Sequence, residues 1–267
     1  CTAEQWQAQD FYQMVYSFGH QIYQEQYPDP VDYRNLDAAA RLKFFDYIYS
    51  IGRRYIAENP QLYGEVASRP VDRRENYVKR CVGLPGQTIQ IKNRIVYVDG
   101  KPNKEPDNVQ YTYYVKLKTS LPDDLMKQLG ISMEDLMSLN ERGYLPLTAR
   151  AARILKSRRD IVESITLNTD ATTEDIYPLN GATGWTRDNY GPVWIPKKGA
   201  TINLTLDNIA IYERPIRVYE GHDLKISNGS IYIDGKLAKT YTFGMDYYWM
   251  MGDNRHNSLV MIAMPAP

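Results

Sequence analysis

The chain has 267 residues, of which 43 % are apolar, and its 32 lysines and arginines balance 32 aspartates and glutamates. These values suit one or two domains with hydrophobic cores and exclude a mainly disordered chain. The zero net charge gives no general attraction to nucleic acid, so no nucleic-acid partner is expected. The longest apolar run, 259–264, is far shorter than the roughly 18 residues that span a bilayer.

The first sixty residues are predicted to be helical. A first helix, with Thr2 and Gln5 in capping-box spacing, ends at the proline-containing turn 27–30. A second helix covers 37–58 and ends before Pro60.

From Gly64 onward, short β-like runs replace the helical periodicity. Strands are expected at 65–67, 77–82, 88–92 and 95–98, separated by tight turns at 83–86 and 99–100. This pattern predicts a meander of antiparallel strands.

The segment 111–220 is mixed and resembles an insertion more than a core. It is expected to contain a tyrosine-rich strand, helices near 123–129, 133–139 and 149–156, and a loop rich in Gly, Asn and Pro at 177–196. After it, 224–236 repeats the pattern of 89–101 without a gap, including the Asp-Gly turn. Two similar hairpins or a true duplication explain this repeat equally well.

Lys79 is the first candidate for chemistry, and it lies within the predicted strand 77–82. Strand alternation places it on one face with Tyr77 and Cys81, and Arg80 on the other face. A lysine has a pKa near 10.4, so it acts as a base at neutral pH only if burial or positive charge lowers that pKa. Because an edge-strand lysine usually faces solvent, Lys79 by itself does not establish catalysis.

A second polar motif, 251–258, reads Met-Gly-Asp-Asn-Arg-His-Asn-Ser and follows an aromatic run at 247–250. By itself it is typical of an ordinary polar loop.

Together, the two motifs resemble those of a known family. Residues 77–80 (Tyr-Val-Lys-Arg) followed by 82–86 (Val-Gly-Leu-Pro-Gly) look like the lysine box of bacterial type I signal peptidases, and 252–258 looks like their last conserved box. Both occur in the expected order, and the resemblance covers about a third of the chain directly. It implies a mainly β fold with a signal-peptidase-like β core, a helical N-terminal insertion and a large α+β insertion.

The resemblance implies a serine endopeptidase that removes signal peptides from exported preproteins after small residues. Lys79 is similar to the general base, which takes the nucleophile's proton and later protonates the leaving amine. Ser258 matches the helper serine that orients this lysine. Val78, with Tyr77 beside it, resembles a residue of the pocket for small substrate side chains, and the strand would pair with the extended substrate.

The same resemblance assigns supporting roles. Arg80 and Asp253 look like a salt-bridged pair that braces the two boxes, and Gly252 would let the backbone pass close to the lysine. Asn254 and Arg255 are expected to be structural. No metal and no organic cofactor are implied, because the chemistry needs only a hydroxyl and a neutral amine. Two cysteines and three scattered histidines also predict no zinc site.

The chain departs from the family pattern in its nucleophile and its end. Nothing between Cys1 and Lys79 resembles the family's Ser-Met-x-Pro-Thr-like box, so the chain as given is expected to be inactive. Ser132 precedes a methionine but lacks the Pro and Thr and follows the lysine, so it is interpreted as a helix N-cap. Apolar residues 259–261 stand where the family continues with polar ones.

We therefore predict a helical insertion at 1–60, a first part of the catalytic core at 61–102, a non-catalytic α+β lobe at 103–221 and a second part of the core at 222–267. The family resemblance implies the cytoplasmic membrane, reached through a missing N-terminal anchor, with the catalytic domain on the extracytoplasmic (periplasmic) side.

Two other functions compete with this interpretation. A mature chain that begins at Cys1 could be a surface lipoprotein with a non-enzymatic binding module. A self-cleaving repressor-type protease also uses serine and lysine, but the neutral charge and the lack of a helix-turn-helix pattern argue against it.

Overall fold

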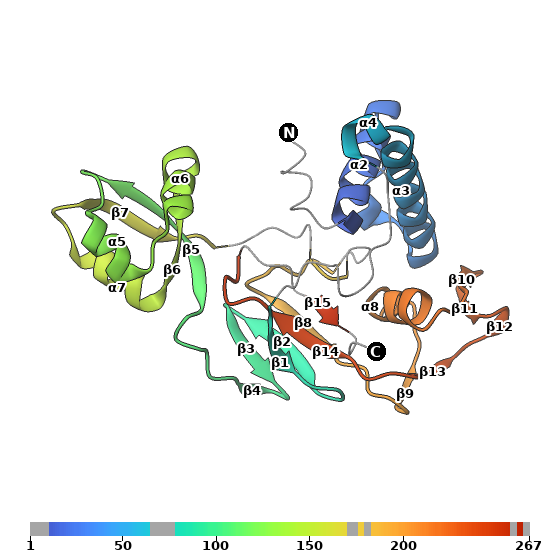
Figure 1. The fold of residues 1–267 in the computed structure, drawn as a ribbon. Helices are drawn as coiled ribbons and strands as arrows, with labels where there is room; N and C mark the ends of the chain where they lie inside the picture. Colours follow the sequence, from blue (N-terminus) through green and yellow to red (C-terminus); the bar gives the residue numbers. More distant parts are fainter. Residues whose placement is uncertain (1–10, 65–77, 170–175, 179–182, 257–260, 264–267) are drawn as a thin grey trace. The chain divides into compact units, whose positions relative to one another are not determined.

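The structure is a computed structural model that describes residues 11–64, 78–169, 176–178, 183–256 and 261–263 (Figure 1). The chain divides into two compact units. One comprises 1–77, 177–183 and 201–242, and the other comprises 78–176, 184–200 and 243–267. These borders differ from the predicted ones, because 222–242 belongs with the helical front and 103–176 belongs with the strands that follow Lys79.

The first unit contains a pair of packed helices, α2 (Phe11–Gln26) and α3 (Ala38–Glu58), with a 3-10 turn at Tyr33–Asn35 and a short α4 (Pro60–Tyr63). Asp37 caps α3, because its side chain accepts a hydrogen bond from the Ala40 amide at 2.8 Å. The prediction of a helix at 37–58 is confirmed. The expected start of the first helix at Thr2 lies outside the described residues.

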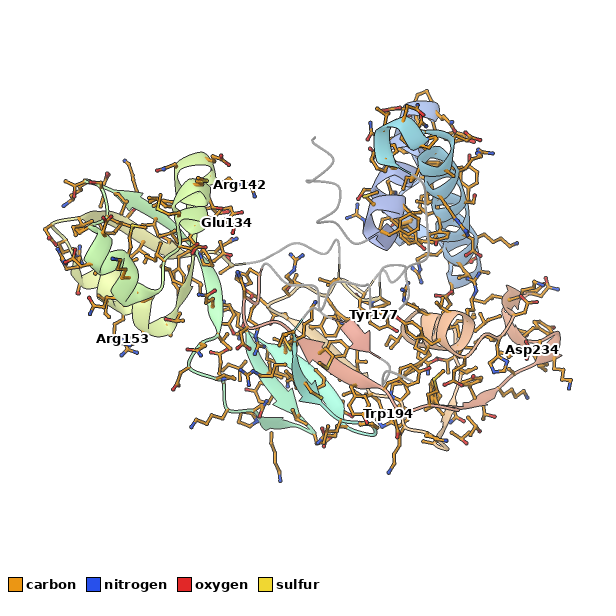
Figure 2. The ribbon with its side chains drawn as sticks, in the orientation of Figure 1. Glu134, Arg142, Arg153, Tyr177, Trp194 and Asp234 are labelled. Carbon is orange, nitrogen blue, oxygen red and sulfur yellow. The ribbon has the colours of Figure 1, made fainter. Side chains whose placement is uncertain are left out.

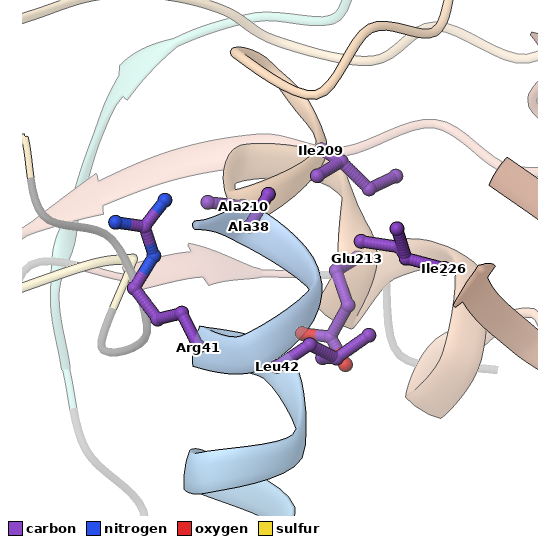
Figure 3. A pocket seen from close by; sticks show the side chains of 7 residues that line it. All are labelled: Ala38, Arg41, Leu42, Ile209, Ala210, Glu213 and Ile226. Carbon is purple, nitrogen blue, oxygen red and sulfur yellow. The ribbon is translucent and has the colours of Figure 1, made fainter. Parts of the chain in front are cut away.

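The rest of the first unit is a small α/β assembly. Helix α8 (Ile209–Arg214) continues into a π-helical turn, Pro215–Tyr219, and strands β9 (Thr201–Asn203) and β13 (Thr240–Thr242) pair. A three-stranded antiparallel sheet of β10 (Leu224–Ser227), β11 (Ser230–Ile233) and β12 (Lys236–Leu237) completes this assembly. A cavity of about 10 Å³, with room for about one water molecule, lies between α3, α8 and β10. Figure 3 shows the side chains that line it.

Two sheets form the β core of the second unit. The first has the order β1-β14-β15 and consists of β1 (Arg80–Gly83), β14 (Tyr248–Met251) and β15 (Met261–Ala263). The second has the order β4-β3-β2-β8 and consists of β2 (Thr88–Lys92), β3 (Ile95–Val98), β4 (Lys101–Pro102) and β8 (Tyr190–Trp194). Trp249 and Tyr247 are fully buried in this core.

The structure corrects the predicted strand borders at two places. The strand expected at 77–82 begins only at Arg80, and Val78 and Lys79 precede it as irregular backbone. The loop expected at 177–196 contains β8, which pairs with β2 through Val193 and Ile89. Alternation was hidden there by Gly191 and Pro192, residues that single-sequence patterns associate with loops. The strand expected at 65–67 lies outside the described residues.

The lobe at 109–167 is a three-stranded sheet with its own hydrophobic core. Strand β5 (Gln110–Leu117) lies between β6 (Tyr144–Thr148) and β7 (Val162–Leu167), and helices α5 (Asp123–Leu129), α6 (Met133–Arg142) and α7 (Ala149–Ser157) contribute side chains to the core. Ser132 Oγ accepts a hydrogen bond from the Asp135 amide, and the Ser132 amide donates to the Asp135 carboxylate. This capping box confirms the predicted N-cap. Glu134 and Arg142 mark the two ends of α6 (Figure 2).

The sequence repeat at 89–101 and 224–236 is also a repeat of structure. Asp99 and Asp234 have φ of 49° and 50° at equivalent turns. Each aspartate accepts a hydrogen bond from the amide eleven residues earlier, at 2.8 Å from Thr88 and at 2.9 Å from Asp223. Asp234 is labelled in Figure 2. Both copies therefore hold their Asp-Gly turn by the same side-chain bond.

Candidate active site

The pairing of β1 with β14 brings the two sequence motifs together. Arg80 lies opposite Met251 and Cys81 opposite Met250 in an antiparallel register. Lys79 directly precedes this pairing and Gly252 directly follows it, so both emerge at the same end of the strand pair. Motifs more than 170 residues apart in sequence thus meet on neighbouring strands.

An ion pair joins the two motifs beside this strand pair. Arg80 donates from Nε to Asp253 Oδ1 at 2.9 Å and from Nη2 to Asp253 Oδ2 at 2.8 Å. This two-bond geometry is the strongest that an arginine and a carboxylate form. The hydrogen bonds from Arg80 hold the pKa of Asp253 below its usual range, and Asp253 in turn raises the pKa of Arg80. The contact expected between these two residues is therefore present.

The loop after β14 is fixed to the start of β5. The Gln110 amide donates to the Asp253 carbonyl at 2.8 Å, and the Arg255 amide donates to the Gln110 carbonyl at 2.9 Å. Gln110 and Asn254 thereby form an isolated parallel bridge. The lobe strand β5 and the second motif are one hydrogen-bonded structure at this point.

A buried network at His256 was not predicted from the sequence. The Thr112 amide donates to His256 Nδ1 at 3.2 Å, and His256 Nε2 lies 3.0 Å from Asp188 Oδ1. Asp188 Oδ2 accepts from Arg94 Nη1 at 3.2 Å. The side chains of His256 and Asp188 are only 5 % and 6 % exposed. His256 was inside a motif already singled out, but no local pattern linked it to Asp188 in a segment interpreted as a loop.

The predicted site residues differ in their exposure to solvent. Lys79 is partly buried, as are Gly252, Asp253 and Asn254, whereas Arg255 is buried. Val78 has a side chain that is 96 % exposed. Tyr77, Ser258 and Cys1 lie outside the described residues, so the distance between Lys79 and Ser258 stays a prediction.

The described part of the chain contains no group of three or more histidine, cysteine or carboxylate side chains arranged to hold a metal ion. None of its helices combines the length and the apolar character needed to cross a bilayer.

Comparison with known proteins finds a family match that includes the lysine motif. Residues 48–142 match the family model described as signal peptidase, peptidase S26. This part of the chain therefore resembles the signal peptidase family. The chain is 33 % identical to signal peptidase I of Rickettsia prowazekii over 118 residues and 34 % identical to signal peptidase I of Rickettsia akari over 88 residues. These matches cover 39 % and 31 % of this chain.

The chain spans less than half the length of these signal peptidase I relatives, 45 % for Rickettsia prowazekii and 33 % for Rickettsia akari. No solved structure matches the chain significantly. The matched residues 48–142 include Lys79 and Arg80 but end before the second motif. The structure adds the link to that motif through the β1–β14 pairing.

Proposed function

We propose that this chain carries part of the catalytic machinery of a signal peptidase I, a serine endopeptidase that removes signal peptides from exported preproteins after small residues. The observation that supports the proposal is the shared end of β1 and β14, from which Lys79 and Gly252 emerge beside the Arg80–Asp253 pair. The match of residues 48–142 to the signal peptidase family model supports it independently.

The proposed reaction is acyl transfer to a serine hydroxyl followed by hydrolysis. The serine oxygen attacks the carbonyl carbon of the scissile peptide bond, and Lys79 takes the hydroxyl proton. When the C–N bond breaks, Lys79 gives this proton to the leaving amine, and water then releases the acyl group. Ser258 would orient the amine of Lys79. Gly252 has no side chain, so the backbone can pass close to that amine.

The proposal takes the nucleophilic serine from a segment outside these 267 residues, because no Ser-Met-x-Pro-Thr-like box is recognisable before Lys79. The proposal therefore places the active enzyme at the cytoplasmic membrane, with an anchor and a nucleophile-bearing segment next to it and with the catalytic face outside the cytoplasm. The exposed Val78 is available for contact with an extended substrate.

The decisive experiment is a cleavage assay on the protein joined to the anchor and nucleophile segment of the Rickettsia prowazekii signal peptidase. The substrate is a preprotein with small residues before its cleavage site. Lys79→Met should abolish cleavage, while Lys101→Met, which alters an exposed lysine of β4, should leave it unchanged. Cleavage retained by Lys79→Met in a folded protein would refute the proposed role.

A further inference from the structure

Arg255 is a buried cation for which the described part of the chain supplies no salt-bridge partner. Arg255 is only 8 % exposed, yet its Nε has no hydrogen-bond partner among the described residues. Its Nη1 donates to the sulfur of Met251 at 3.4 Å, a weak acceptor. Within the described ranges of the chain, no carboxylate forms a salt bridge with Arg255. A guanidinium has five N–H donors, and the buried Nε–H of Arg255 is one that finds no acceptor among the described residues.

This arrangement is energetically unfavourable unless something else compensates the charge. An arginine stays protonated in proteins, so burial cannot be relieved by loss of its proton. Buried charges in folded proteins are normally paired or hydrogen-bonded, because the desolvation penalty of an ion is otherwise not repaid. The position of Arg255 therefore indicates a binding partner that does not belong to the described residues.

A cavity of about 480 Å³ lies beside Arg255 and has room for such a partner. Residues of β1, of the β2–β3 turn, of β3, of the segment before β5 and of β5 itself line it, including Arg80, Arg94, Lys104, Glu105 and Tyr111. The cavity is therefore bordered by four cationic side chains, counting Arg255, and by one carboxylate.

The charges of this lining do not cancel. Asp253 pairs with Arg80 and Asp188 pairs with Arg94. Glu105 accepts a hydrogen bond of 2.5 Å from the Tyr111 hydroxyl and makes no salt bridge with Arg255.

After these pairings, the buried Arg255 and the exposed Lys104 face a single carboxylate. The lining thus keeps an excess of one positive charge, which suits an anionic ligand.

We propose that this cavity is a binding site for a phosphate group, carried either by inorganic phosphate or by a phospholipid headgroup. Arginine recognises phosphate through its planar fork of N–H donors. A tetrahedral phosphate presents oxygen atoms in several directions, so it can meet cations from separate segments, here Arg255 and Lys104. The inference goes beyond the proposed peptidase function and does not depend on it.

The test compares thermal unfolding of the protein in sodium phosphate and in sodium chloride at equal ionic strength. A ligand that binds the folded state raises Tm, and near saturation a rise of about 3 °C or more is expected. Phosphate also stabilises proteins generally by exclusion from their surface, so the rise must be compared between variants.

Three variants separate a specific site from this general effect. Arg255→Met replaces the guanidinium by an apolar side chain of similar length and should remove the phosphate-specific rise in Tm. In chloride, the same variant should have a higher Tm than the wild type, because it removes a buried charge. Lys104→Ala alters an exposed position and should weaken phosphate binding about threefold in calorimetric titration. Lys101→Ala, outside the cavity, should change neither quantity. An equal rise in all variants, or no rise in any, overturns the proposal.

A second arm distinguishes the two sources of phosphate. Dihexanoylphosphatidylglycerol below its micelle concentration is titrated in parallel with inorganic phosphate. Tighter binding of the lipid, lost in Arg255→Met, supports a headgroup site, whereas binding of inorganic phosphate alone supports a free-phosphate site. Binding of both ligands that persists in Arg255→Met overturns both versions. Lys104→Ala still decides the matter if Arg255→Met does not fold, because unaltered affinity in this variant would refute the site.

Discussion

Arg80 and Asp253 are joined by two parallel hydrogen bonds of 2.9 and 2.8 Å although 173 residues separate them in sequence. The pair links the start of β1 to the loop that follows β14. Because 45 % of the Arg80 side chain and 34 % of the Asp253 side chain are exposed, solvent screens the attraction. Its value to the protein therefore lies mainly in fixing geometry beside Lys79.

Arg80→Lys and Asp253→Asn should each lower the urea midpoint of unfolding modestly, and the double variant should lose less than the sum of the two. The pKa of Asp253 is lowered in the folded chain, so its stabilising contribution is complete above its unfolded value near 4 and is lost as pH falls through the folded pKa. The gap between the wild type and Asp253→Asn should accordingly close in acid. Midpoints measured at pH 7 and at about pH 2 check this, and strictly additive losses would show that the pair is not coupled.

His256 should hold its proton on Nε2. The Thr112 amide points at Nδ1, which must therefore accept, and Asp188 Oδ1 then accepts from Nε2–H. Nitrogen-15 NMR of the imidazole distinguishes the two tautomers directly. His256→Phe should cost about 2 kcal/mol or more, because it leaves the buried Asp188 oxygen and the Thr112 amide without their partner. A proton found on Nδ1 at neutral pH would contradict the assignment.

Gly52 should tolerate no side chain at the contact between α2 and α3. A Cβ built there would lie 1.9 Å from the Val15 carbonyl oxygen, and one at Gly19 would lie 2.1 Å from the Ile48 carbonyl oxygen. Alanine is a better helix former than glycine by roughly 1 kcal/mol, but here the helices must separate to admit it.

Gly52→Ala is therefore expected to be destabilising by about 1–3 kcal/mol in chemical unfolding. Ser50→Ala, at an exposed position of the same helix, is the control and should stay within about 0.5 kcal/mol of the wild type. A Gly52→Ala protein that is more stable than the wild type would show that the two helices are not in close contact.

Glu213→Gln should stabilise the protein at neutral pH. Burial raises the pKa of Glu213, and this effect exceeds the lowering by Arg217, whose Nη1 lies 2.7 Å from Glu213 Oε1. The same Arg217 nitrogen also lies 3.0 Å from Asp46 Oδ1. A raised pKa means that the folded chain favours the protonated form of Glu213. The contribution of Glu213 to the free energy of unfolding is therefore present at low pH and is lost as pH rises through the folded pKa.

The glutamine variant mimics the protonated form of Glu213. Its advantage over the wild type should therefore be present at pH 7 and vanish near pH 4, as measured by urea midpoints. Asp46→Asn is the matched variant, because it removes the second carboxylate from the same arginine. An advantage of Glu213→Gln that is constant with pH would contradict the raised pKa.

The local pattern of the chain determined most helices and several strands. Asp37 and Ser132 begin helices because their side chains accept from the free amides of a first turn, which is a property of neighbouring residues. Strands β2 and β3 have the borders expected from their alternation and from the Asp99-Gly100 turn, at which Asp99 has a positive φ. The two motifs that point to signal peptidases were likewise legible as short runs.

Contacts between distant residues could only come from the tertiary structure. Strand β8 was read as a loop because its glycine and proline mask the pattern, and its pairing partner β2 lies about a hundred residues earlier. The bond between Asp188 and His256 and the burial of Arg255 Nε away from any described acceptor depend on which segments pack together. Short-range propensity decides where an element begins, whereas burial and charge pairing are set by the packing of segments far apart in the chain.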